Sequence, residues 1–120
     1  MPEFLRLLIV DDQRRARQSL RALLAARFPS IETQEAENGS EAVRRAREWR
    51  PDIVLMDARM PVLDGIEATR EIKRQTPQIK VIVLSLFAEY HATALEAHAD
   101  AFINKGDPPE RLLTLLLISA

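Results

Sequence analysis

The chain alternates short apolar runs with longer segments in which apolar residues recur every three or four positions. Nearly continuous apolar runs occupy residues 5–10, 53–56 and 81–84. Runs of this length are typical of strands that are buried on both faces, as in a parallel sheet. The more polar residues 31–36 predict an edge strand, and residues 101–104 predict a short fifth strand.

Helical spacing fills the intervals between these strands. The first predicted helix spans residues 14–27, in which Ala16, Leu20, Leu23 and Leu24 form one stripe. The other helices are predicted between an N-cap at Ser40 and Pro51, and over residues 66–76, 90–97 and 110–120. The alanine-rich helix over 90–97 has little bulk to bury, so we expect it to be the least firmly packed.

The last helix is unusually rich in leucine. One helical face can bury Leu112, Leu115 and Leu116. This arrangement leaves Leu113 and Leu117 to cover the core as well, to form an interface, or to contact an output domain beyond residue 120.

Five strands alternating with five helices predict an α/β fold with a parallel sheet, right-handed crossovers and helices on both faces. The length of 120 residues corresponds to one domain, which we expect to span residues 1–120. In such sheets ligands bind beyond the carboxyl ends of the strands, where the strand order reverses.

Composition removes several classes of function. The chain has no cysteine, which excludes disulfides and thiolate metal sites. A net charge of -1 gives no electrostatic reason to expect nucleic-acid binding. The apolar runs are too short to span a membrane, and no signal-peptide pattern is present. We therefore expect a cytoplasmic protein without membrane contact.

Polar residues follow the predicted strands at positions that should meet at one edge of the sheet. They are Asp11, Asp12, Asp57, Ser85 and Lys105. Three clustered carboxylates repel each other unless a cation neutralises them, and Mg²⁺ suits an all-oxygen site. A carboxylate nucleophile, a hydroxyl donor and an ammonium beside Mg²⁺ are the components of a phosphoryl-transfer site. Taken singly, each residue has a simpler explanation as a helix cap or a solvated charge.

The order of these motifs resembles the receiver domain of two-component response regulators. The resemblance rests on Val10-Asp11-Asp12, Leu55-Met56-Asp57, Met60-Pro61, Asp64-Gly65, Ser85 and Lys105, and it covers essentially the whole chain. It implies a doubly wound, flavodoxin-like sheet of five strands in the order 2-1-3-4-5.

The resemblance also implies roles for the residues that bind metal. Asp57 would be the phosphoacceptor, taking its phosphoryl group from a histidine kinase or a small phosphodonor. Asp12 would be the main Mg²⁺ ligand, together with Asp57 and the backbone carbonyl of Arg59. Asp11 would help to hold the ion, partly through water.

Three further residues would bind the phosphoryl group or respond to it. By the same resemblance, Lys105 would contact the phosphoryl group, and Ser85 would rotate to bond it. Phe102 would be an aromatic switch that turns inward when Ser85 moves. Phe102 lacks a hydroxyl group, so its inward state would depend on packing alone.

The sequence departs from the receiver pattern at three places. Leu86 stands where many receivers have a small residue, and its bulk is expected to restrict access to the phosphoryl group. Gly106 replaces a proline that commonly follows the lysine. His98 lies where a glycine turn often precedes the fifth strand, and we expect it to be an exposed residue at a helix end.

The resemblance implies a sensor histidine kinase as partner. It also implies a homodimer or output contact through residues 90–97, 101–104 and 110–120. The loop over 105–109 resembles that of receivers attached to helix-turn-helix output domains. Such a domain is absent from these 120 residues, so we expect this chain to make no direct nucleic-acid contact. The arginines at 14, 15, 17 and 21 are interpreted as a solvated helix face.

Two other functions remain open at this point. An aspartyl-nucleophile phosphohydrolase would commonly need an Asp-x-Asp motif and a substrate-enclosing cap, whereas Asp11 and Asp12 are adjacent. A pseudo-receiver would be an interaction module that does not use its site residues, and the departures at Leu86 and Gly106 keep this hypothesis open.

Overall fold

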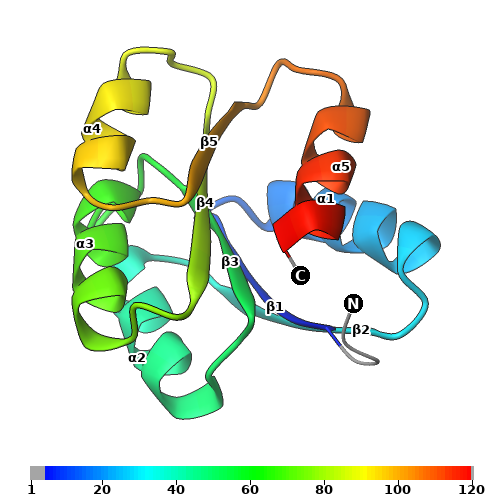
Figure 1. Cartoon of the computed structure of the whole chain (residues 1–120), viewed down its shortest axis with the longest axis horizontal. Helices are drawn as coiled ribbons and strands as arrows, with labels where there is room; N and C mark the ends of the chain where they lie inside the picture. The colour runs from blue at the N-terminus through cyan, green and yellow to red at the C-terminus, as the bar shows by residue number, and fades with distance from the viewer. Residues whose placement is uncertain (1–4, 120) are drawn as a thin grey trace.

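Five strands form one sheet in the computed structural model, which describes residues 5–119 (Figure 1). They are β1 (Leu5–Val10), β2 (Ile31–Ala36), β3 (Ile53–Asp57), β4 (Lys80–Ser85) and β5 (Ala101–Asn104). All neighbouring strands are parallel, in the order β2-β1-β3-β4-β5. The predicted doubly wound, flavodoxin-like fold is therefore confirmed.

Five helices cover the two faces of this sheet. They are α1 (Arg14–Arg27), α2 (Gly39–Trp49), α3 (Gly65–Gln75), α4 (Tyr90–Glu96) and α5 (Pro109–Ser119). In Figure 1, α1 and α5 lie on one side of the sheet, and α2, α3 and α4 lie on the other. No helix among the described residues is long and apolar enough to cross a membrane.

Alternation along the strands divides the apolar core into two layers. Leu7 and Ile9 of β1 point to the side of α1 and α5, where they join Leu24 and Leu116. Leu8 and its alternating neighbours point to the side of α2, α3 and α4. Because side chains on a strand alternate between faces, a central strand that is covered on both sides must be apolar throughout.

β3 lies between β1 and β4, which places its last residue, Asp57, at the centre of the sheet edge. The start of α3 packs directly against this end of β3. A Cβ atom on Gly65 would lie only 1.8 Å from the carbonyl oxygen of Asp57. Glycine at position 65 therefore permits the close approach of α3 to the strand that carries Asp57.

The start of α2 differs from the prediction that Ser40 is its N-cap. The cap is Asn38, whose side-chain oxygen accepts a hydrogen bond of 2.8 Å from the backbone N–H of Glu41. Asn38 has an extended backbone, whereas Ser40 already lies inside the first turn. Both residue types cap helices well, so the choice depends on where the chain leaves β2.

The predicted faces of α5 were also partly wrong. Leu113 is buried together with Leu112 and Leu116, whereas Leu115 is only half-buried. Of the two leucines left over from the predicted face, Leu113 covers the core, which was one of the alternatives, and Leu117 is exposed. The helix was predicted to continue to Ala120, which lies outside the described residues.

Candidate functional site

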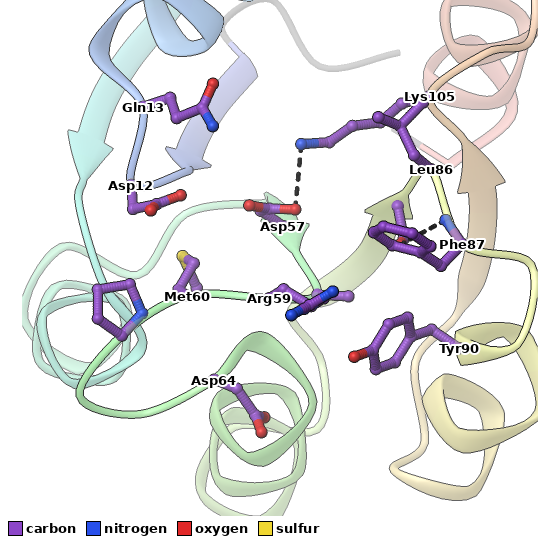
Figure 2. A pocket seen from close by; sticks show the side chains of 13 residues that line it. Asp12, Gln13, Asp57, Arg59, Met60, Asp64, Leu86, Phe87, Tyr90 and Lys105 are labelled. Atoms are coloured by element: carbon purple, nitrogen blue, oxygen red, sulfur yellow. Dashed lines mark hydrogen bonds and ion pairs between the residues drawn. The ribbon is translucent and has the colours of Figure 1, made fainter.

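The carboxyl ends of the strands surround an open pocket of about 620 Å³. It is lined by residues from the ends of four strands, including Asp12, Asp57, Ser85 and Lys105. Figure 2 shows Lys105 reaching across this pocket toward Asp57. The structure thus brings together side chains that are up to 93 positions apart in the sequence, at the sheet edge that the strand pattern predicted.

Asp57 and Lys105 form the central ion pair of the site. The Lys105 Nζ atom lies 3.0 Å from Asp57 Oδ1 and 3.0 Å from Asp11 Oδ2. Asp57 is only 9% exposed, and Asp11 is also buried. One ammonium therefore bridges two carboxylates that come from different strands.

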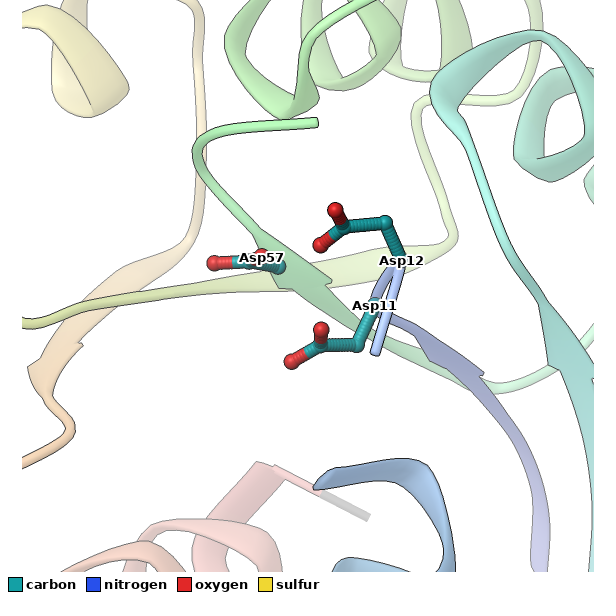
Figure 3. A group of neighbouring side chains, drawn as sticks. All are labelled: Asp11, Asp12 and Asp57. Carbon is teal, nitrogen blue, oxygen red and sulfur yellow. The ribbon is translucent and has the colours of Figure 1, made fainter. Parts of the chain in front are cut away.

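Asp11, Asp12 and Asp57 form a cluster in which one carboxylate oxygen from each residue lies within 4.8 Å of the others (Figure 3). Asp11 is further oriented by the backbone N–H of Gln13, which donates to its Oδ1 atom at 2.9 Å. Asp12 is exposed and lines the pocket, so solvent reaches the cluster from that side. A set of three carboxylates with one open side fits a hard divalent cation such as Mg²⁺.

The surroundings of Asp57 disfavour its negative charge. Burial raises the pKa of the Asp57 carboxyl above its ordinary value, and the charges of Asp11 and Asp12 act in the same direction. Lys105 opposes these effects without overcoming them. Burial alone would lower the pKa of Lys105, but its hydrogen bonds and ion pairs with Asp57 and Asp11 raise that pKa overall. Lys105 therefore remains an ammonium, and the cluster holds more negative charge than this lysine neutralises.

Ser85 lies at the end of β4 and is only 2% exposed. Its hydroxyl oxygen accepts a hydrogen bond of 3.0 Å from the backbone N–H of Phe87. The backbone oxygen of Ser85 accepts a hydrogen bond of 2.9 Å from the N–H of Lys105, which joins the loops that follow β4 and β5. In this arrangement the Ser85 hydroxyl is engaged with its own loop.

Three aromatic or cationic side chains at the pocket were not predicted from the sequence. The Arg59 guanidinium carbon lies 5.3 Å from the centre of the Phe87 ring, and Phe87 meets Tyr90 edge to face. These side chains all line the pocket (Figure 2). Arg59 is two residues beyond Asp57, and Phe87 is two residues beyond Ser85. Asp57 and Ser85 were identified because polar residues at the ends of parallel strands meet at one edge of the sheet. Residues shortly after those strand ends, such as Arg59 and Phe87, are expected near the same edge.

Phe102 lies apart from this pocket. Its half-buried ring packs on the side of α4 and lines a surface groove between β5 and α5. The ring stacks on His91 of α4, with 4.9 Å between centroids and 10° between planes. The structure therefore places the predicted switch residue on the face formed by α4, β5 and α5.

The three departures from the receiver pattern have simple local structures. The Leu86 side chain is 64% exposed at the rim of the pocket. The backbone N–H of Gly106 donates to the Asn104 side chain at 2.8 Å, and the peptide bonds of the described residues are all trans. His98 is exposed and follows α4 with a φ of 70°, the conformation that favours glycine.

Comparison with known proteins identifies relatives for nearly the whole chain. A family model described as "Response regulator receiver domain" matches residues 7–117. The transcriptional regulatory protein LnrK of Bacillus subtilis (strain 168) is 41% identical over 103 residues, which cover 84% of this chain and 47% of LnrK. The response regulator protein VraR of Staphylococcus aureus (strain Mu3 / ATCC 700698) is 38% identical over 103 residues, covering 84% of this chain and 49% of VraR. The chain thus spans about half the length of these curated relatives.

Comparison with solved structures also identifies response regulators as similar proteins. The response regulator TrrA of Thermotoga maritima, in complex with Mg²⁺-BeF, aligns with a TM-score of 0.90 and 28% identity, covering 97% of this chain and 99% of TrrA. A DNA-binding response regulator of the LuxR family from Staphylococcus aureus aligns with a TM-score of 0.88 and 28% identity, covering 96% of this chain and 98% of that chain. The similarity of fold therefore extends over nearly the whole chain.

Proposed function

Since the chain belongs to the response regulator receiver domain family of two-component signalling, we propose that it is a switch controlled by phosphorylation of Asp57. The observation that carries this proposal is the position of Asp57, which is buried beside two carboxylates and 3.0 Å from a lysine. We also infer that residues 1–120 form a single receiver domain.

In the proposed reaction, a carboxylate oxygen of Asp57 attacks the phosphorus of the donor. A bond forms between this oxygen and phosphorus, while the bond from phosphorus to the leaving group breaks. The leaving group is the imidazole of a kinase histidine or the carboxylate of an acyl phosphate. Hydrolysis by water later returns Asp57 to its carboxylate and releases inorganic phosphate.

The surrounding residues hold the charge that this reaction creates. Lys105 stays charged, so its ammonium is available to pair with the phosphoryl oxygens. The Ser85 hydroxyl leaves the N–H of Phe87 and donates to a phosphoryl oxygen. Catalysis at such a site is mainly positioning and charge neutralisation.

A Mg²⁺ ion fits the acidic cluster. We propose that Asp12, Asp57 and the backbone carbonyl of Arg59 hold it, with Asp11 contributing partly through water. When bound, Mg²⁺ would neutralise negative charge on the carboxylates and the phosphoryl oxygens. This role follows from the donor set, since three carboxylates converge where the phosphoryl group would bind.

We propose a sensor histidine kinase as the protein phosphodonor, with small acyl phosphates as alternative donors. Phosphorylation would change the face formed by α4, β5 and α5, with Ser85 and Phe102 as the residues that respond. This face would then control a homodimer contact or a DNA-binding output domain C-terminal to these residues. The receiver itself would act on no separate substrate and would touch neither nucleic acid nor membrane.

The proposal is tested by treating the purified chain with acetyl phosphate and Mg²⁺ and measuring its intact mass. We expect a gain of one phosphoryl group in wild type and none in Asp57→Ala. Asp52→Ala is the matched control and should be labelled normally, because Asp52 is exposed and bonds to the backbone N–H of Arg6 outside this site. A folded wild-type chain that stays unlabelled would point to a pseudo-receiver, and sustained hydrolysis of a generic phosphate ester would point to a phosphohydrolase.

A further inference from the structure

The stacked pair of His91 and Phe102 joins two elements of the proposed output face. His91 is exposed on α4, and Phe102 is half-buried on β5. Their rings are nearly parallel, at 10°, with centroids 4.9 Å apart. This geometry is within the range of a favourable aromatic contact.

α4 also contacts the core through Tyr90 and Ala94. The helix has only seven residues, and Ala94 is the one buried residue among them. Its N-cap residue, Glu89, makes no side-chain cap bond, and its first turn carries no acidic residue. A short helix without a cap depends on tertiary contacts for its position. The stack with Phe102 therefore adds an attachment to β5 to the core contacts of Tyr90 and Ala94.

Phe102 is also connected to the pocket through the sheet. It pairs with Val83 of β4, and Ser85 is two residues further along the same strand. Side chains two residues apart lie on the same face of a strand. The Ser85 side chain and the Phe102 ring therefore lie on the same face of neighbouring strands, so a ring that turns inward moves toward the position of Ser85.

We propose that His91 is a positioning residue that holds Phe102 on the α4 side and thereby opposes phosphorylation-dependent switching. This inference rests on the proposed function, in which Phe102 turns inward when Ser85 bonds the phosphoryl group. Since an inward turn of Phe102 would break the stack, its contribution would favour the inactive state alone. Loss of an aromatic contact of this kind should tighten the binding of a phosphoryl mimic between about twofold and tenfold.

The test is a titration of the chain with beryllofluoride at saturating Mg²⁺, followed by amide NMR. We expect His91→Ala to lower the half-saturating concentration of beryllofluoride between about twofold and tenfold. His91→Phe keeps a stacking ring, so it should restore the wild-type value. His98→Ala is the matched control, because His98 is the other histidine of the chain and lies exposed beyond α4. It should leave the half-saturating concentration unchanged.

A merely structural role for His91 makes a different prediction. In that case His91→Ala would loosen α4 and leave the mimic's affinity unchanged or weaker, which would overturn the proposal. The Phe102→Leu background gives a second measurement, since the effect of His91→Ala should disappear there if it acts through the stack. An undiminished effect in that background also overturns it.

The same titration separates this inference from the proposed function. Binding by wild type and not by Asp57→Ala, with no change in His91→Ala, refutes only the role of His91. Failure of wild type to bind the mimic refutes both. In an independent readout, chains labelled with 4-fluorophenylalanine have four phenylalanine positions, and the Phe102 ¹⁹F resonance should shift in His91→Ala before any ligand is added.

Discussion

Replacing Asp57 with asparagine should stabilise the fold in the absence of divalent metal. The substitution keeps the shape of the side chain and removes one of three clustered negative charges. It does not leave Lys105 without a partner, because its ammonium also lies 3.0 Å from Asp11. The penalty of an unpaired buried charge therefore does not arise.

The size of the effect follows from the distances in the cluster. At an effective dielectric constant of about 20, the attraction between Asp57 and Lys105 at 3.0 Å amounts to about 5 kcal/mol. At the same dielectric constant, repulsion at 4.8 Å amounts to about 3 kcal/mol for each of Asp11 and Asp12. A hydrogen bond from Lys105 adds to this attraction, so the repulsions offset most of it, and burial of the Asp57 carboxylate, which is the largest effect on its pKa, makes the charged form unfavourable overall. We expect Asp57→Asn to raise the free energy of unfolding by about 1–2 kcal/mol at pH 7.

The stability gained by Asp57→Asn should increase as the pH rises. The pKa of Asp57 is raised in the folded state, so the folded chain holds this proton more tightly than the unfolded chain. The penalty of its charge is therefore absent when both states are protonated, and it develops as the pH rises through the ordinary aspartate value. Urea denaturation at pH 7 and at pH about 3 should show the gain at the higher pH only.

Adding Mg²⁺ should reduce the stability difference between Asp57→Asn and wild type. Saturating Mg²⁺ should stabilise wild type by mass action and remove most of the advantage of Asp57→Asn, which lacks one proposed ligand. Glu37→Gln is the control, since it removes a charge from an exposed residue and should change stability little in either condition. A loss of stability in Asp57→Asn at pH 7 without metal would refute the charge argument.

Further predictions concern single residues held in unfavourable environments. The buried Thr69 hydroxyl has no hydrogen-bond partner among the described residues, so Thr69→Val should raise the free energy of unfolding by about 1 kcal/mol. Thr76→Val is its control and should lower that free energy by about 1 kcal/mol, because the Thr76 hydroxyl donates to a backbone oxygen at 3.2 Å; equal effects in urea denaturation would contradict the reasoning. Val62 has a φ of 71° and is 84% exposed, so Val62→Gly should gain about 0.5–1 kcal/mol in thermal unfolding, whereas Val62→Ala should gain nothing. His98→Gly should gain about 1 kcal/mol in the same assay at the C-terminal end of α4, and a lower melting temperature would count against it.

The fold was predictable because each strand and helix carries its own period. Strands buried on both faces leave continuous apolar runs, and their carboxyl ends must meet at one edge. Asp57 and Lys105 could therefore be placed together before any contact was known. The contact between Arg59 and Phe87 was not predicted, because it depends on how two loops fold back over the pocket. The faces of α5 were ambiguous because leucine occupies five of the six positions from 112 to 117, which removes the contrast that a helical period needs.

In the proposed mechanism, Lys105 links the metal site to the phosphoryl site through its two carboxylate partners. Without a divalent cation, its ammonium is the positive charge that offsets Asp11 and Asp57. A divalent cation held by the same carboxylates would take over part of that task and weaken the attraction of both for Lys105. The ammonium would then be free to follow a phosphoryl group on Asp57, whereas Ser85 would still have to break its bond to the N–H of Phe87. Binding of the metal would thus prepare only one of the two groups proposed to contact the phosphoryl oxygens. The phosphoryl group itself would have to drive the release of Ser85 from its own loop.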